Sequence, residues 1–187
     1  MGDHNDAGQI LRGDLPPDLP FDQTRPLYFS VSVTKLVVMS VVTFGLYEVY
    51  WFYKNWQLIK LRERSDIRPV WRALFSIFYC YALFKHIAAT AEQSTLGKLE
   101  SGYLAFGWIV FAYFLVRLPD PYWLVSFFSF LFLIPVQNVV NQLNSIHSAS
   151  IDPNGSFGGW NIVGMVLGGI GLLLLVLGMV FMPEAGV

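Results

Sequence analysis

The chain has 187 residues, of which 55% are hydrophobic and 13% are charged, and its mean hydropathy is +0.50. Soluble domains carry about twice that charged fraction, and a soluble domain of this size cannot hide so much apolar surface. The formal net charge of −1 excludes binding of nucleic acid through bulk positive charge. The single cysteine, Cys80, excludes an intrachain disulfide. The composition therefore predicts a polytopic membrane protein.

The first 26 residues differ from the rest of the chain. They hold five aspartates against two arginines, and four prolines interrupt any regular structure. No basic start followed by an apolar run is present, so no cleavable signal is expected. The sequence predicts a disordered acidic tail over 1–26 and a helical transmembrane domain over 27–187.

Five long apolar segments follow, and each predicts a helix because backbone groups in hydrocarbon must bond internally. A helix needs ~20 residues to cross a ~30 Å hydrocarbon core. The third segment, with 16 residues, falls short of this length, and the other four reach it. The segments run over Leu36–Trp56, Trp71–Ala91, Tyr103–Leu118, Pro121–Val140 and Trp160–Met182. The expected fold is an all-α bundle of about five transmembrane helices.

Orientation follows from a basic link between the first two segments, which is expected on the cytoplasmic side. It contains Lys54, Lys60, Arg62, Arg64, Arg68 and Arg72. Five crossings would then place the N-terminus outside and the C-terminus inside. In the alternative, Gly45 interrupts the first segment, and the piece Tyr47–Arg64 leaves the membrane as an interfacial helix. The first element is then re-entrant, four crossings remain and the N-terminus lies inside.

A motif within the first segment carries a family resemblance. Residues 43–56 read TFGLYEVYWFYKNW, and the downstream runs PVWRALF (69–75), PVQ (135–137), NQLN (141–144) and GWN (159–161) accompany it. Together they resemble small bacterial multi-pass membrane proteins of unknown function. The resemblance implies a location in the bacterial cytoplasmic (inner) membrane, and it brings no catalytic residues with it.

Three ionisable side chains within the apolar segments are candidate site residues: Glu48, Lys85 and His86. Because a charge inside a bilayer is costly, Glu48 is expected to pair with Lys54 or Arg72 of the basic link. Lys85 and His86 are expected near the outer end of the second segment. Lys85 can extend outward to the interface. His86 belongs to a polar stripe that favours helix packing over a proton relay.

Amide side chains form a second candidate cluster at Gln137, Asn141 and Asn144, on one face of the fourth segment and continuing toward Ser148. Pro135 precedes them and predicts a kink. Amides rarely face lipid, so the expected role is a seam of hydrogen bonds between helices. The alternative is a site for a polar solute at the outer leaflet.

The fifth segment contains small residues at Gly164, Gly168 and Gly171, a spacing that lets helix backbones approach closely. Packing against another helix of the same chain is expected, and a second subunit is the alternative. The six basic residues of the link are also candidates for binding anionic lipid headgroups. Aromatic residues beside the link are expected to anchor it at the headgroup level.

Motifs for catalysis, nucleotide binding and metal binding are absent from the sequence, and no cofactor or metal is expected. Two isolated histidines, His86 and His147, are too little to predict a metal or haem site. The first hypothesis is therefore a non-enzymatic accessory, scaffold or assembly subunit that binds lipids and another membrane protein or a second copy. A small transporter or channel using Gln137, Asn141, Glu48 and Lys85 is the alternative. A lipid- or quinone-acting enzyme is the second alternative.

Overall fold

The computed structural model describes residues 25–147 and 154–181, and within them regular structure is helical apart from one isolated bridge between Val31 and Asn154. The prediction of an all-α fold is confirmed. The predicted acidic tail lies outside the described residues except for its last two positions, as does Ser148.

The first apolar segment is not one helix, and the prediction of a continuous helix over Leu36–Trp56 is wrong. Helix α1 covers Val33–Val42 and helix α2 covers Leu46–Glu63. Between them Phe44 and Gly45 adopt positive φ angles of 53° and 82°. A helix cannot continue through two left-handed residues, so the chain changes direction here, and the interruption expected at Gly45 in the alternative is present.

The second segment is also divided. Helix α3 covers Pro69–Leu74 and helix α4 covers Ser76–Gln93, and Phe75 between them leaves helical geometry with φ −98° and ψ 38°. Pro69 occupies the first turn of α3, where its missing N–H costs nothing. The prediction of one continuous helix through Trp71–Ala91 is therefore wrong at Phe75, the fifth residue of that segment.

The third and fourth segments form a helical hairpin. Its first arm is α5 (Ser101–Ile109), continued by a π-helical turn, η2 (Val110–Phe114), and a 3₁₀ turn, η3 (Leu115–Arg117). After the proline-rich turn, the second arm is a 3₁₀ helix, η4 (Tyr122–Phe132), that passes into α6 (Leu133–His147). The change from 3₁₀ to α geometry falls just before Pro135, where the predicted kink was placed.

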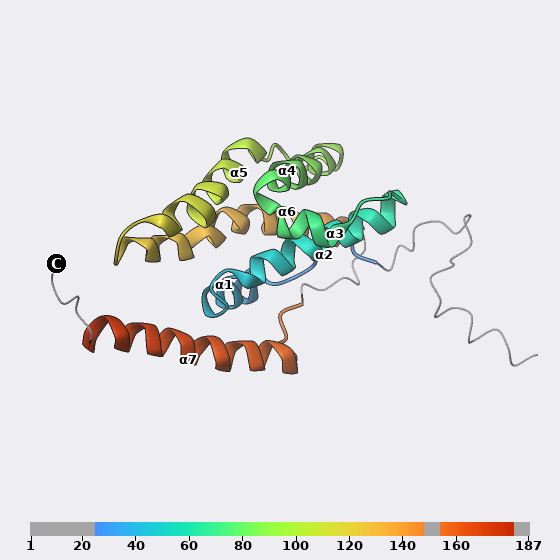
Figure 1. The fold of residues 1–187 in the computed structure, drawn as a ribbon. Helices are drawn as coiled ribbons and strands as arrows, with labels where there is room; N and C mark the ends of the chain where they lie inside the picture. Colours follow the sequence, from blue (N-terminus) through green and yellow to red (C-terminus); the bar gives the residue numbers. More distant parts are fainter. Residues whose placement is uncertain (1–24, 148–153, 182–187) are drawn as a thin grey trace, which may run out of the picture.

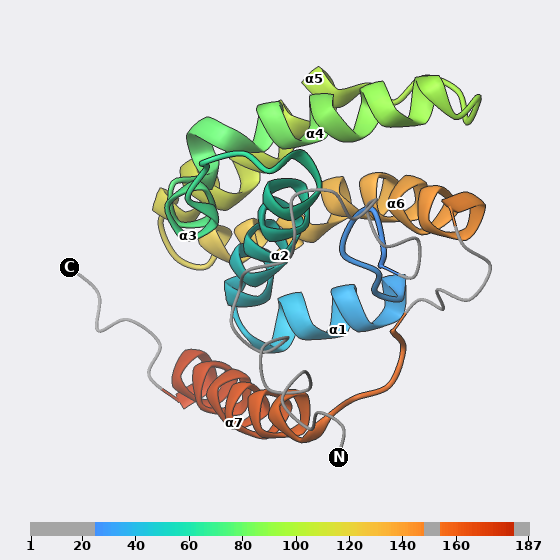
Figure 2. The ribbon, with the colours of Figure 1, turned by 90° about the vertical axis from the view of Figure 1, so that its right-hand side faces the viewer.

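The helices stack in the order seen in Figure 2, with α4 and α5 at one side, α2, α3 and α6 in the middle, and α1 beyond them. The last helix, α7 (Gly159–Phe181), lies outside this stack against α1 (Figure 1). Large side chains fill the centre, including the fully buried Trp51, Phe52 and Phe84, whose rings contact one another.

Three glycines bring α7 onto α1. A Cβ built on Gly168 would lie 1.6 Å from the carbonyl oxygen of Val42. Gly164 lies opposite Met39 and Gly171 lies opposite Phe44 at ordinary or tight contact distances. The glycines singled out in the sequence thus line an intramolecular contact, in which the absent side chain at position 168 is what allows the two backbones to touch.

One helix among the described residues is long and apolar enough to cross a membrane: Tyr122–His147, which has 26 residues and contains an 18-residue stretch with a mean hydropathy of 1.8. The other apolar stretches that meet the hydropathy criterion are shorter, at Val33–Val42, Ser101–Arg117 and Asn161–Leu175. The break at Phe44–Gly45 leaves α1 with only 10 residues, which is too short to cross a membrane.

Candidate functional site

An extended segment of the chain, Leu27–Ser32, passes through the middle of the bundle. We refer to it as the strap. Tyr28 and Val31 of the strap are fully buried. Within the strap, helical hydrogen bonds are absent, so its buried N–H and C=O groups need partners elsewhere.

Side-chain amides of α6 supply those partners. Asn144 accepts from the N–H of Tyr28 (3.2 Å) and donates to the C=O of the same residue (2.9 Å). Gln137 donates to the C=O of Phe29 (3.2 Å), and Asn141 donates to the C=O of Val31 (3.0 Å). These contacts reproduce with side chains the ladder that a neighbouring β-strand would provide.

Helix α2 completes the arrangement from the other side. Asn55, which is fully buried, accepts from the N–H of Phe29 (3.1 Å) and donates to the C=O of Trp51 (2.9 Å). The indole N–H of Trp51 donates to Gln137 Oε1 at 2.5 Å and so fixes which end of that amide faces the strap. We call Asn55, Gln137, Asn141 and Asn144 the amide clamp.

The amide clamp corrects the predicted role of the α6 cluster. Gln137, Asn141 and Asn144 were expected to join helix to helix, and instead most of their hydrogen bonds go to the backbone of the strap. The alternative, a site for a polar solute, is also disfavoured, because the strap occupies the place beside these amides that a solute would take.

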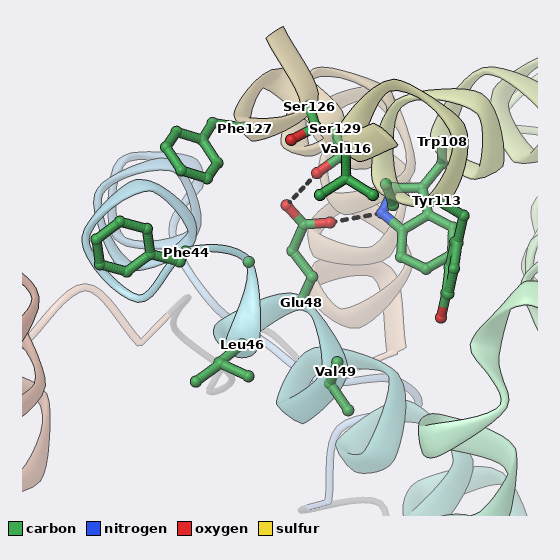
Figure 3. A pocket seen from close by; sticks show the side chains of 12 residues that line it. Phe44, Leu46, Glu48, Val49, Trp108, Tyr113, Val116, Ser126, Phe127 and Ser129 are labelled. Carbon is green, nitrogen blue, oxygen red and sulfur yellow. Dashed lines mark hydrogen bonds between the residues drawn. The ribbon is translucent and has the colours of Figure 1, made fainter. Parts of the chain in front are cut away.

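Glu48 forms a second buried polar site in the first turn of α2, with a side chain only 2% exposed. Its Oε2 accepts from the indole N–H of Trp108 (2.5 Å), and its Oε1 accepts from the hydroxyl of Ser129 (2.8 Å), as Figure 3 shows. The three residues come from α2, α5 and η4, so the carboxyl group ties together three elements that are far apart in the sequence.

A cavity of about 250 Å³ lies beside this carboxyl group. Glu48 is the one charged residue among those that line it. The lining residues are Phe44, Gly45, Leu46, Glu48, Val49, Trp108, Ala112, Tyr113, Val116, Ser126, Phe127 and Ser129. Three of them are exposed, and Leu46, at 72%, is the most exposed, so the cavity reaches the surface among apolar side chains.

The predicted ion pair of Glu48 with Lys54 or Arg72 is wrong. Lys54 instead donates to Gln57 (3.4 Å) and lies over the ring of Tyr50. The guanidinium of Arg72 lies 4.4 Å from the ring centre of Trp56 and 5.2 Å from that of Tyr79. Helix geometry explains the miss, because a residue six positions along α2 points to a different face from Glu48.

His86 occupies an unexpected place. Its Nε2 lies 2.6 Å from a carboxylate oxygen of Glu63, at the end of α2, and its Nδ1 lies 3.3 Å from the hydroxyl of Tyr28. The prediction that His86 and the basic link lie at opposite ends of a crossing helix is therefore wrong, because Glu63 is part of that link. Lys85 is exposed on α4 and is not among the residues that line the cavity beside Glu48.

The basic link has residues of two kinds. Arg62 donates to the C=O of Leu27 (3.0 Å) and stacks over the ring of Tyr28, so it holds the strap in place, while Arg72 is stacked between aromatic rings. Arg64 and Arg68 are exposed, and Lys60 is half-buried. The exposed Arg68 and the half-buried Lys60 therefore remain candidates for lipid headgroups, while Arg62 and Arg72 are held by the strap and by aromatic rings.

Asn55, Trp108 and Ser129 contribute to the two sites and were missed from the sequence. Asn55 carried a usable signal, because it lies seven residues after Glu48, close to two helical turns, within an otherwise aromatic run. Trp108 and Ser129 carried none, since a tryptophan and a serine in apolar helices are ordinary.

No family model, no curated protein and no solved structure matches this chain. The function must therefore be argued from the geometry alone.

Proposed function

We propose that this chain is a non-enzymatic integral protein of the bacterial inner membrane that serves as an accessory or assembly subunit. The observation that carries this proposal is how the buried amides are used. In a transporter for polar solutes, such groups would line a path, whereas here Gln137, Asn141 and Asn144 each bond to the backbone of the strap. Buried polar groups that are fully satisfied make a core rigid and specific, as a structural subunit requires.

Apolar side chains on the outside support placement in a bilayer. Soluble monomers rarely expose apolar patches of more than a few hundred Å². Here α7 alone presents nine large apolar side chains that are 40–76% exposed. They are Ile162, Val163, Val166, Leu167, Ile170, Leu173, Leu174, Leu177 and Phe181. Surface of this kind is stable only against lipid or against another apolar protein face.

In the proposed arrangement, the hairpin of α5 and α6 and the helix α7 cross the bilayer, and α1–α2 forms a re-entrant hairpin whose turn at Phe44–Gly45 lies within it. The 23 residues of α7 reach ~34 Å at 1.5 Å per residue, enough for a ~30 Å core. The end of α2 and the link after it then face the cytoplasm, where Lys60 and Arg68 meet anionic headgroups at about 1 kcal/mol each.

A photo-crosslinking amino acid placed at Leu174 tests the subunit role in intact cells. We expect a discrete protein adduct, either with another membrane protein or with a second copy, because α7 presents nine exposed apolar side chains. The matched position is Leu131 on η4, 48% exposed, which is expected to yield mainly lipid adducts. Lipid adducts alone from both positions would overturn the subunit role.

A further inference from the structure

The cavity beside Glu48 has features that its structural role does not require. If the carboxyl group served only to join three helices, the space next to it would be filled, because protein interiors are packed closely. Instead about 250 Å³ remains open next to a carboxyl group that is 2% exposed. Among the described residues, no lysine, arginine or histidine lies within 4.0 Å of its oxygens.

The hydrogen bonds of Glu48 leave room at the carboxyl group for a further donor. Each of its oxygens accepts one hydrogen bond, and the donor to Oε2 is an indole N–H, which can only donate. A carboxylate oxygen can accept two hydrogen bonds, so acceptor capacity remains for a further donor.

The walls of the cavity are suited to a cation. On one side the rings of Phe44 and Phe127 contact each other at 5.4 Å, and on the other side Trp108 and Tyr113 do so at 5.8 Å (Figure 3). Aromatic faces attract ammonium groups electrostatically within about 6 Å of the ring centre. A protonated amine bound between the two ring pairs would stabilise the ionised form of Glu48, because an opposite charge nearby favours the charged form of a buried carboxyl group.

We propose that this cavity binds a small amphipathic organic cation, a protonated amine with a compact apolar body. The ammonium group would donate to the free acceptor positions of Glu48, and the apolar body would lie between the ring pairs. The rim residues Phe44, Leu46 and Val116 are exposed and apolar, which favours such a molecule over a hydrated metal ion. Entry from the lipid phase rests on the proposed membrane placement, whereas binding itself does not.

Thermal unfolding of the full-length protein in detergent tests the site, with cyclohexylammonium chloride as the probe. Cyclohexanol is the neutral control of the same shape, and sodium chloride controls for ionic strength. We expect saturable stabilisation by the amine, with an apparent affinity at least about tenfold tighter than that of cyclohexanol. Equal stabilisation by the alcohol, equal stabilisation by sodium chloride, or no stabilisation by the amine would each overturn the proposal.

Two variants with matched controls locate the binding. Glu48→Gln removes the charge at nearly constant shape and is expected to abolish the difference between amine and alcohol, whereas Glu92→Gln on the exposed end of α4 leaves it intact. Ala112→Leu fills the cavity and retains the carboxylate, and it is expected to weaken amine binding at least about tenfold. Exposed Ala82→Leu is its control. Wild-type binding in Ala112→Leu would contradict the proposal even if Glu48→Gln failed to fold.

The membrane proposal and the cavity proposal fail in different ways. A chain that proved soluble without detergent would refute the first, and amine binding could then be measured in buffer. A membrane-embedded chain without amine binding would refute the second alone.

Discussion

Replacing Asn144 by leucine is expected to lower the free energy of unfolding by roughly 2–5 kcal/mol. Asn144 is fully buried, and it bonds both the N–H and the C=O of Tyr28. Leucine has a similar volume but no polar group, so both backbone groups of Tyr28 would be left buried without a partner. Each such loss costs about 1–3 kcal/mol, and the total is a large share of a typical stability of 5–15 kcal/mol.

Gln142→Leu on the exposed face of the same helix is the control, with little effect on stability expected. Thermal unfolding by circular dichroism gives the stabilities. Hydrogen exchange of the strap gives a second readout, since release of Tyr28 from the clamp should speed exchange of its amide at least about tenfold. Equal stability and equal strap protection in the two variants would show that the amide clamp does not hold the strap.

Adding one methyl group at Gly168 is expected to separate α7 from α1. In most helices glycine to alanine is stabilising, by about 1 kcal/mol. At Gly168 the new Cβ would meet the backbone oxygen of Val42 at 1.6 Å, and a backbone atom cannot give way as a flexible side chain can. We therefore expect the opposite sign, a destabilisation of about 1–3 kcal/mol.

The neighbouring glycine offers a matched control. A Cβ at Gly169 would meet nothing within 4 Å, so Gly169→Ala should be neutral or slightly stabilising. Spin labels at Leu46 and Leu177, both exposed, report the separation of α7 from the α1–α2 turn in a Cys80→Ser background. The distance distribution should broaden in Gly168→Ala and remain unchanged in Gly169→Ala. The same distribution and stability in both variants would contradict the assigned packing.

Much of the helical content could be predicted from apolar runs, but only one of the two breaks within them has a signal in the sequence. Gly45 signalled the first, because a glycine readily adopts the left-handed geometry found there. Phe75 carried no comparable signal, since phenylalanine neither ends nor interrupts helices by itself. That break comes from tertiary packing, which brings Arg72 over Trp56 on one side and sends α4 toward α5 on the other.

Four of the polar residues in the two sites could be named from the sequence, but the partners that they bond could not. Gln137, Asn141 and Asn144 share a helix face, which local geometry predicts well. Their partner is the backbone of the strap, which has neither helical nor strand periodicity and directly follows the acidic tail in the sequence. Contacts between positions more than a hundred residues apart leave no trace in local patterns.

Accessibility of single cysteines in inner-membrane vesicles tests the central claim, that the apolar helices lie in a bilayer with the basic end toward the cytoplasm. In a Cys80→Ser background, cysteine replaces Arg64 or Leu174, and a membrane-impermeant maleimide is added to vesicles of both orientations. We predict that position 64 reacts only in inside-out vesicles and that position 174 reacts only after detergent is added. Reaction of position 64 from the outer face alone, or of position 174 in intact vesicles, would contradict the proposed placement in the membrane.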